Sequence, residues 1–419
     1  MMTEKEGKRF ARDSFSRKTT VIWVVSVAVL LMAGAPFLLD RLMDGLAMAG
    51  TTNRVPWGLW VVAYTWFSGL AGGLFLVSSL GYLFRLKCFM PIARLALAGS
   101  VTFLAVSMFL IGLDLGVVGN AAGALLYFRW SSALSWEIKM YAVFAVIVLV
   151  QLALVLRSDS ADMEQRGNRN LAVRVLSGLG VALSFVGPPG GTGMLFSVVE
   201  ARGLWNSGIM AVLFYVMAIA AAAAFLTVAY VLLARLRQHR FEQATARGLS
   251  IVLASSLAAM AFVLFFQIST PLMGGVAQSF QAAYILTAGS LAPLFWIGGV
   301  FVGAVFPSAL IVGALRCGLI GMAVAAGIAT MAGAFALRYA LIMAGFGVPL
   351  LQGMPGSVYV PSIAEIMILV FAFGCAGGLF GLVVRFLPLE VMGASEGMLE
   401  PARACAGADA EEVRHGTAA

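Results

Sequence analysis

Charged residues are scarce in this sequence. Of its 419 residues only 11% are charged, whereas 61% are hydrophobic, and the mean hydropathy is +0.98. A soluble domain of this length needs a far more polar surface. The composition therefore excludes an ordinary soluble protein and indicates a polytopic membrane protein built from long apolar helices.

Histidine is almost absent, and cysteine follows no ligand pattern. His239 lies in the basic run RLRQHR and His415 lies near the end of the chain, so neither falls in an apolar segment. A b-type haem held by paired intramembrane histidines is thereby excluded. The four cysteines are scattered and form no CxxC motif. We expect no metal site in this chain, whether zinc or iron–sulfur.

The apolar runs predict an all-α fold of about ten transmembrane helices packed as bundles. Each run is long enough to cross a bilayer, and the fifth is the shortest. Their predicted positions are 21–39, 57–84, 95–118, 134–156, 171–187, 206–234, 249–270, 291–315, 318–345 and 361–387. We interpret the first run as a retained helix rather than a cleaved signal peptide, because no convincing cleavage site follows it.

These runs divide the chain into three parts. Residues 1–20 form a polar, basic N-terminal tail, residues 21–390 form the transmembrane domain, and residues 391–419 are expected to be a disordered C-terminal tail. Both tails are predicted to be cytoplasmic.

The distribution of basic residues gives the predicted orientation. With both termini in the cytoplasm, 21 of the 27 lysines and arginines fall on the cytoplasmic side. The remaining six are Arg41, Arg54, Arg129, Lys139, Arg202 and Arg338. This asymmetry is what the positive-inside rule requires of an even number of helices. The net charge of +8 thus reports orientation, and it gives no reason to expect nucleic-acid binding.

The stretch from Arg54 to Leu80 has two distinct faces when it is read as a helix. Pro56 suits the first helical turn. Gly69 and Gly73 form a small-xxx-small pair that lets another helix pack closely. A second face carries a polar and aromatic stripe, made of Trp57, Trp60, Tyr64, Ser68 and Ala71.

Two predicted outward connections contain no charged residue. They are 271–290 and 346–360, and both contain glycine and proline. An apolar outer surface of this kind is typical of a docking platform for a partner protein. Segment 271–290 is equally compatible with a re-entrant or buried loop.

Charged residues inside the predicted spans are few, and each has a structural interpretation. Glu137 and Glu365 lie in first helical turns, where the helix dipole favours a carboxylate. Ser362 and Glu365 match a capping box, so that capping and function are equally supported for Glu365. Asp114 needs a basic partner, for which Arg129 and Arg338 are candidates. Lys139 can snorkel to the surface.

Several of these charged residues nevertheless share one depth in the membrane with two tyrosines. The predicted topology places six residues in the outer half: Tyr64, Asp114, Glu137, Tyr141, Arg338 and Glu365. The inner half has no titratable carboxylate, whereas a transporter or proton pump usually shows a polar path across the midplane. The pattern favours a polar, aromatic pocket at the outer leaflet that accepts a lipid-soluble ligand with polar head atoms.

With these residues in view, the chain resembles the NrfD/PsrC family of quinone-interacting membrane subunits. Six stretches carry the resemblance: VPWGLWVVAYTWFSGLAGG (55–73), SALSWEIKMY (132–141), GMLFSVVEARGLWNS (193–207), FWIGGVFVGAVFP (295–307), RYALIMAGFGVP (338–349) and YVPSIAEI (359–366). The length and the Pro-Ser-x-x-Glu motif are similar to the longer, ten-helix branch that includes HybB and QrcD. Relatives such as HybB carry a histidine before the stretch that matches GGTGMLFS, and this chain has none there.

The resemblance implies a subunit of a respiratory oxidoreductase complex in the bacterial inner membrane. The chain would contain no haem or metal and would use menaquinone or ubiquinone as its substrate. It would exchange electrons with a periplasmic iron–sulfur subunit, which is joined to a catalytic or multihaem cytochrome c subunit.

On this hypothesis the outer-half residues receive roles. Asp114 or Glu137 would deliver protons, with Glu365 as a further proton-transfer group, and Arg338 would balance buried negative charge. The ring pocket would be lined by Trp57, Trp60, Tyr64, Trp130 and Tyr141. Two alternatives stay open: a proton-coupled transporter or ion pump, and a purely structural membrane anchor of a periplasmic complex.

Overall fold

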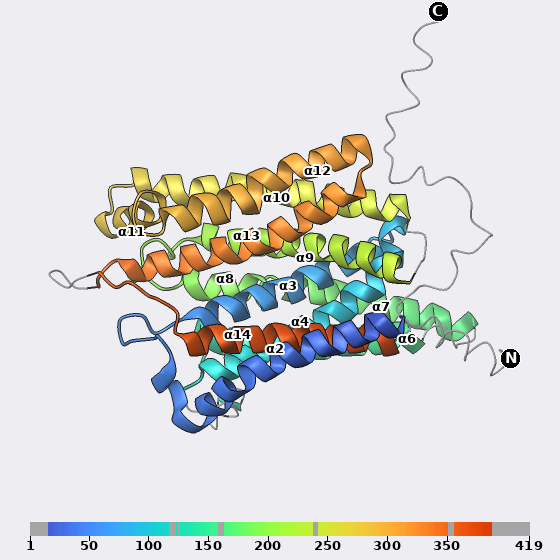
Figure 1. The fold of residues 1–419 in the computed structure, drawn as a ribbon. Helices are drawn as coiled ribbons and strands as arrows, with labels where there is room; N and C mark the ends of the chain where they lie inside the picture. The colour runs from blue at the N-terminus through green and yellow to red at the C-terminus, as the bar shows by residue number, and fades with distance from the viewer. Residues whose placement is uncertain are drawn as a thin grey trace, which may run out of the picture.

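The computed structural model describes residues 16–116, 123, 126–157, 163–237, 242–350 and 356–387. All regular elements within these ranges are helices, and the long ones run side by side as a bundle (Figure 1). The fold class expected from the sequence is therefore confirmed. Most of the two predicted tails, 1–20 and 391–419, lies outside the described residues.

The helices follow one another in antiparallel fashion along the bundle axis (Figure 1). The long helices are α2 (Arg17–Asp44), α3 (Leu59–Tyr82), α4 (Met90–Asp114), α6 (Ala133–Arg157), α7 (Met163–Leu183), α9 (Gly208–Leu236), α10 (Gln243–Met273), the continuous pair η5 (Leu294–Val305) and α12 (Phe306–Cys317), α13 (Ile320–Gly347) and α14 (Ile363–Phe386). The short helices are η1 (Gly45–Met48), η2 (Lys87–Phe89), α8 (Gly190–Ser197) and α11 (Ala277–Thr287).

Nine helical segments of the described chain are long and apolar enough to cross a membrane. They match nine of the ten predicted spans. The remaining one is the fifth in chain order, predicted at 171–187. It corresponds to α7, whose apolar part is shorter and covers Asn170–Leu183. The span predicted to be the shortest is thus also a short apolar helix in the structure.

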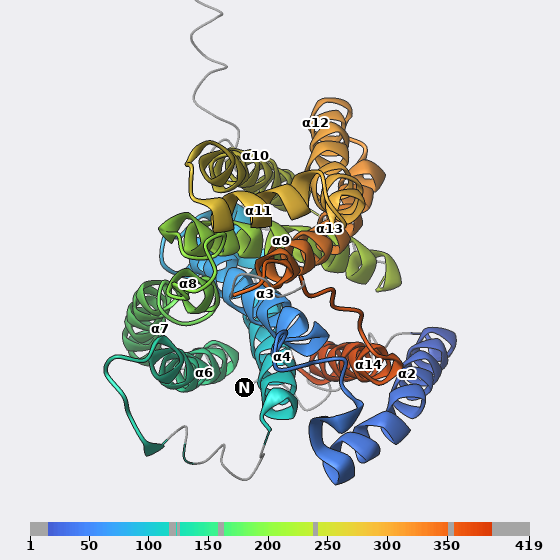
Figure 2. The same ribbon diagram turned by 90° about the vertical axis from the view of Figure 1, so that its left-hand side faces the viewer.

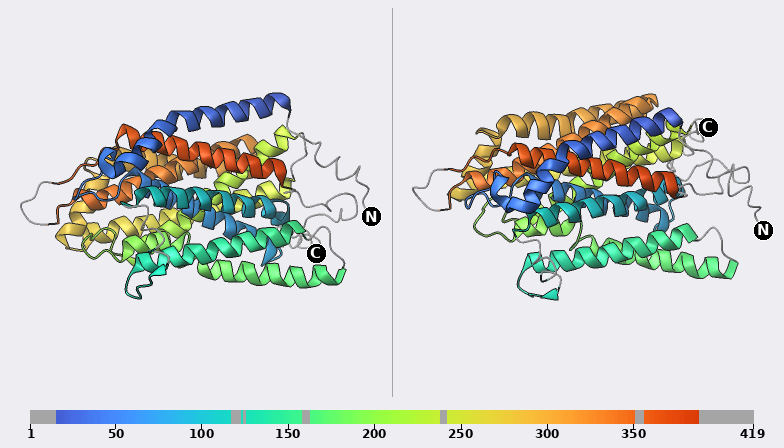
Figure 3. Two further views of the ribbon diagram at one scale, coloured as in Figure 1. Left: turned by 90° about the horizontal axis from the view of Figure 1, so that it is seen from below. Right: turned by 60° about the horizontal axis from the view of Figure 1, so that its bottom comes forward.

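The bundle has two different ends. The start of α2 and the end of α14 lie together at one end, here called the terminal end (Figures 1 and 3). At the opposite end α11 lies across the bundle beside α10 and α13, and the segment 45–58 lies at this end on the other side of the bundle (Figures 1 and 2). We call it the α11 end. Segment 271–290, expected to be a loop, is thus largely helical, since α10 extends to Met273 and α11 follows.

Helix α3 is the centre of the bundle (Figure 2). Its most apolar window is 94% buried, far more than that of any other candidate span. Close helix packing makes this possible: a Cβ atom at Gly73 would lie 2.2 Å from the Ala218 carbonyl oxygen of α9. The predicted close helix packing is confirmed for Gly73, whereas the atoms nearest to Gly69 are those of the Arg338 guanidinium.

The start of α3 differs from the prediction. The helix begins at Leu59, with Gly58 at its N-cap position. Pro56 therefore precedes the helix, and its expected place in the first turn is wrong. Since Trp57 also precedes the helix, it does not continue the face of Trp60 and Tyr64.

Candidate functional site

A buried polar cluster joins α3 and α6 in the half of the bundle near the α11 end. Tyr141 of α6 and Ser68 of α3 are both buried, and their hydroxyls share a hydrogen bond. Glu137 precedes Tyr141 by one helical turn and is only 3% exposed. Tyr64, one turn before Ser68, lies near enough to interact electrostatically with Glu137 and Tyr141. Sequence and structure thus agree in bringing Tyr64, Glu137 and Tyr141 together.

The Glu137 carboxylate is unusual for a buried acid. Among the described residues, neither of its oxygens has a partner with hydrogen-bond geometry, although the Tyr141 side chain lies close enough to interact with it. A buried carboxylate without hydrogen bonds is costly and therefore rare unless a ligand or a proton satisfies it. This makes Glu137 the strongest candidate for a functional acid.

Segment 187–193, which lacks the histidine that relatives such as HybB carry, lies beside Glu137. A Cβ atom at Gly191 would be 3.6 Å from the Glu137 Cγ atom, and one at Gly72 would be 2.4 Å from the Pro188 carbonyl oxygen. Segment 187–193 therefore packs against both α3 and α6. Glu137 thus contacts the stretch GGTGMLFS, before which relatives such as HybB carry a histidine.

Arg338 of α13 is fully buried next to this cluster. Its Nη1 donates to the Thr65 carbonyl oxygen of α3, and its Nη2 donates to the Phe214 carbonyl oxygen of α9 at 3.2 Å. The guanidinium carbon also lies 4.8 Å from the centre of the Phe214 ring. Its hydrogen-bond partners are thus backbone carbonyls, and Tyr141 is the group with which it interacts electrostatically.

Asp114 has a different partner from those expected. Arg41 of α2 interacts with it electrostatically, whereas the sequence suggested Arg129 or Arg338. The suggestion failed because the sequence does not show which helices are neighbours in the bundle, and so gives no sign that α2 lies near the end of α4. Within the buried cluster, Tyr64 is the residue with which Asp114 interacts electrostatically.

Glu365 of α14 is buried and fully occupied by hydrogen bonds. Its carboxylate accepts from the Ser362 and Gly50 backbone N–H groups at 2.8 and 2.9 Å and from the Tyr359 hydroxyl at 2.5 Å. The predicted capping box with Ser362 is confirmed. These bonds favour the capping interpretation of Glu365 over proton transfer.

Tyr359 lies outside the membrane-spanning helices and links three segments. Its hydroxyl accepts from the Leu59 N–H at 2.7 Å while it donates to Glu365. Burial, together with the hydrogen bond to Glu365, raises the pKa of this hydroxyl well above its usual value. Tyr359 therefore stays protonated and acts as a fixed donor.

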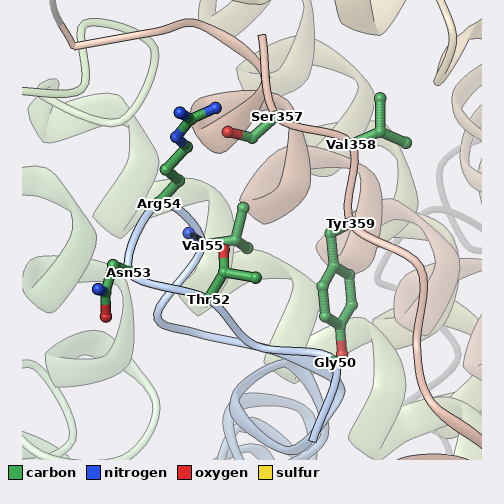
Figure 4. Close-up of a pocket in the computed structure, with 8 residues that line it drawn as sticks. All are labelled: Gly50, Thr52, Asn53, Arg54, Val55, Ser357, Val358 and Tyr359. Carbon is green, nitrogen blue, oxygen red and sulfur yellow. Dashed lines mark hydrogen bonds between the residues drawn. The ribbon is translucent and has the colours of Figure 1, made fainter. Parts of the chain in front are cut away.

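A polar pocket of about 470 Å³ opens at the α11 end above Tyr359 (Figure 4). The linkers that join α2 to α3 and α13 to α14 form its walls. Arg54 is the charged residue of its lining; the others are Gly50, Thr52, Asn53, Val55, Ser357, Val358 and Tyr359. In Figure 4 the Arg54 side chain rises beside Ser357 at one side of this pocket.

The three predicted tryptophans make their described contacts with groups other than Glu137. Trp57 stacks on Trp205 with ring centres 5.8 Å apart. The Trp60 indole N–H donates to the Glu365 carbonyl oxygen at 3.3 Å. Trp130 is 77% exposed and contacts the rings of Phe128 and Trp136. A quinone-binding role for these tryptophans stays a prediction that the geometry does not support.

Sequence reasoning assigned no functional role to three residues that the structure makes important. Ser68 carries a signal, since it lies one turn after Tyr64 on the same helical face. Tyr359 stands just before the capping motif but has no local sign of its long-range bonds. Arg41 has no such sign either, because the Leu113 carbonyl that it bonds lies 72 residues away.

The fold defines a multi-pass integral membrane protein, and Glu137, Tyr141, Ser68 and Tyr64 form a buried polar cluster in the half of the bundle near the α11 end. Residues 47–349 match the family described as "Polysulphide reductase, NrfD", and the chain belongs to this family. The motif-based resemblance is thereby confirmed.

Two relatives each cover more than four fifths of the chain, and a third covers half of it. A selenate reductase subunit of Mesobacillus selenatarsenatis is 25% identical over 408 residues, which are 88% of this chain and 94% of that protein. The Hdr-like menaquinol oxidoreductase integral membrane subunit of Archaeoglobus fulgidus is 25% identical over 81% of this chain and 82% of its own length. A putative dimethyl sulfoxide reductase membrane subunit of Halobacterium salinarum is 24% identical over 50% of this chain and 51% of its length.

Proposed function

We propose that this chain is the quinone-interacting membrane subunit of a respiratory oxidoreductase complex. It exchanges electrons between an attached iron–sulfur subunit and menaquinone or ubiquinone, which is its substrate. Membership of the NrfD family and the similarity to a menaquinol oxidoreductase membrane subunit support this assignment. The proposed location is the bacterial inner membrane, with both termini in the cytoplasm.

The observation that carries the proposal is the unpartnered carboxylate of Glu137 beside the Tyr141–Ser68 pair, among the residues that the structure describes. Reduction of a quinone carbonyl needs a hydrogen-bond donor at the oxygen and a nearby proton source, and oxidation of the quinol needs the reverse. The hydroxyls of Tyr141 and Ser68 supply donors, and Glu137 supplies or accepts the proton. The cluster therefore fits the polar head of a quinone.

The other predicted groups take supporting roles in this proposal. Tyr64 lies next to the quinone ring, and Asp114 is the alternative proton-transfer group. Arg338 is assigned the balance of buried negative charge in the cluster, since it interacts electrostatically with Tyr141, the neighbour of Glu137. A buried cation whose described hydrogen-bond partners are backbone carbonyls is well suited to this task.

Protons are exchanged with the aqueous phase at the α11 end, which this orientation makes periplasmic. Electrons arrive there too, because the docking surface for the iron–sulfur subunit is placed at the same end. Residues 280–285 and 347–349, which belong to the two uncharged connections, meet in that region, where Tyr284 of α11 and Pro349 line a shared groove of about 190 Å³. A catalytic protein or a multihaem cytochrome c completes the electron path.

The test is quinone-linked turnover by the assembled complex with Glu137→Gln. Amide replacement keeps the size of the side chain and removes its ability to carry a proton. Loss of a general acid or base typically lowers a rate by about 100-fold or more. Wild-type turnover by this variant would contradict the role assigned to Glu137.

Two controls separate chemistry from assembly. Gln151→Met replaces another fully buried polar residue of α6, whose amide bonds Ser177 of α7 away from the cluster. It should leave quinone turnover unchanged. The activity of the catalytic protein with an artificial electron carrier should be equal in all variants, which shows that the complex is intact.

A further inference from the structure

The first and last described helices lie outside the part of the chain that matches the family. The match covers residues 47–349, whereas α2 ends at Asp44 and α14 begins at Ile363. Although more than 300 residues separate them, α2 and α14 pack against each other along one edge of the bundle (Figure 2). They form one structural unit added to the matched core.

Small residues of both helices allow the close contact, since Gly34 of α2 and several glycines of α14 lie at it. A Cβ atom at Gly374 would lie 3.0 Å from the Leu30 Cβ atom, and one at Gly381 would lie 2.4 Å from the Trp23 ring. The Trp23 indole N–H donates to the Gly377 carbonyl oxygen at 3.0 Å. Within α2 only Gly34 and Arg41 are buried. Apart from its contact with α14, therefore, α2 has one buried charged residue, Arg41, that attaches it to the rest of the bundle.

Arg41 connects this unit to the end of α4. Its Nε and Nη2 atoms donate to the Leu113 carbonyl oxygen at 2.9 and 2.6 Å, and Nη2 also donates to the Leu115 carbonyl oxygen at 2.7 Å. These carbonyls flank Asp114 in the sequence. A cation at this place satisfies free carbonyls of a helix C-terminus and interacts favourably with the helix dipole.

Glu365 makes the corresponding connection from α14 to the start of α3. Its backbone carbonyl accepts from Trp60, and its carboxylate holds Gly50 and Tyr359, of which Tyr359 in turn bonds the Leu59 N–H. The guanidinium carbon of Arg41 lies 5.9 Å from the centre of the Trp60 ring, so that the two connections meet.

We propose that α2 and α14 form a brace that holds the α11 ends of α3 and α4 in register, with Arg41 as its main positioning residue. The brace fixes the spacing between α3, which carries Tyr64 and Ser68, and the last turn of α4, which carries Asp114. An attachment needed only for stability is better made from apolar contacts, because burying a charge is costly. A buried arginine with three hydrogen bonds to one helix end instead gives a defined geometry.

The experiment compares Arg41→Gln with Trp23→Phe in the assembled complex, reconstituted in lipid nanodiscs. Both variants weaken contacts of α2, but only Arg41→Gln removes the bonds to α4. Hydrogen–deuterium exchange measures the amides of residues 111–116, and quinone-linked turnover is measured on the same samples. With Arg41→Gln we expect at least tenfold faster exchange in this segment and at least tenfold lower turnover per assembled complex. Trp23→Phe should change neither.

Conservative variants keep the test decisive if Arg41→Gln fails to assemble. Arg41→Lys keeps the charge but cannot reach two carbonyls with one planar group, so it should give a smaller change in the same direction. Glu365→Gln should quicken exchange at residues 58–61 instead. The exchange readout does not depend on the proposed function, whereas the turnover readout rests on it.

The outcomes are distinct. Unchanged exchange at 111–116 in both Arg41 variants overturns the brace. Faster exchange with wild-type turnover overturns its role in positioning the site. If the wild-type complex shows no quinone-linked turnover at all, the proposed function fails, and the exchange data still decide whether the brace exists.

Discussion

The Tyr141 hydroxyl links α6 to the central helix α3 through its hydrogen bond with Ser68. Tyr141→Phe removes this link but keeps the ring. We expect a loss of stability of about 1 kcal/mol, typical of one hydrogen bond. Turnover should fall by more than this loss explains, by about tenfold, because Glu137 loses the polar neighbour that orients its proton. Steady-state quinone kinetics and thermal unfolding of the purified complex measure the two effects.

Ser68→Ala is the matched control for this change. It breaks the same hydrogen bond but leaves the Tyr141 hydroxyl beside Glu137. Its stability should fall as much as that of Tyr141→Phe, while its turnover falls less. Equal turnover in the two variants would show that the hydroxyl acts only as a structural link.

Tyr359 gives a prediction for alkaline pH. Its raised pKa means that the folded protein keeps this proton at pH values where the unfolded chain, with a tyrosine pKa of about 10, has lost it. The unfolded state then binds fewer protons, so stability falls as pH rises above about 10. Below that pH the contribution is fully present.

The measurement is the melting temperature between about pH 8 and pH 11, a range that spans the tyrosine pKa of the unfolded chain. Wild-type protein should lose more stability at the alkaline end than Tyr359→Phe, which has no proton to lose at this position. The variant should be less stable than wild type at the lower pH, since Leu59 and Glu365 lose a partner. Parallel curves for the two proteins would rule out this role of Tyr359.

At the scale of helices, the apolar runs predict nearly all of the structure. Long runs of this kind can only be helices in a bilayer, since every backbone group must be bonded within its own segment. Helix ends are less certain, as the start of α3 at Leu59 shows. Gly58 and the bond from Leu59 to Tyr359 decide that start, and a partner 300 residues away leaves no local signal.

The packing of α2 on α14 predicts the effect of a single large side chain. Gly381→Leu would place its side chain in the space of the Trp23 ring. We expect a destabilisation of about 1–3 kcal/mol, typical of overpacking. Gly377→Ala is the control, because its Cβ atom would lie 4.0 Å from its nearest neighbour, Val27.

Thermal unfolding of both variants in the same detergent provides the comparison. A melting temperature of Gly381→Leu equal to that of Gly377→Ala would contradict the close contact between α2 and α14.

At the scale of the whole molecule, the depth of a residue in the membrane was easier to predict from the sequence than the residues that it contacts. Six residues lie in the half of the bundle near the α11 end, as their places along the helices require: Tyr64, Asp114, Glu137, Tyr141, Arg338 and Glu365. Which of them meet depends on helix neighbours. The sequence therefore could not separate Glu137, which lies at the buried cluster, from Glu365, which is satisfied as a cap.

The orientation of the bundle is testable with single-cysteine proteins. Cys317 is exposed and ends α12 at the terminal end, whereas Arg54 is exposed at the α11 end. With the other cysteines replaced, a membrane-impermeant maleimide should label Cys317 only in inside-out vesicles. Arg54→Cys, in a chain without native cysteines, should be labelled only in right-side-out vesicles. The opposite pattern would reverse the proposed topology.

The most direct test of the central claim is photolabelling of the intact complex with an azidoquinone, followed by peptide mapping. The account predicts labels in α3 around Tyr64 and Ser68 and in α6 around Glu137 and Tyr141. An excess of unlabelled quinone should compete, and Glu137→Gln should reduce the labelling. Competed labels confined to α10 or α12, or no competed label in this chain, would contradict a quinone site at Glu137.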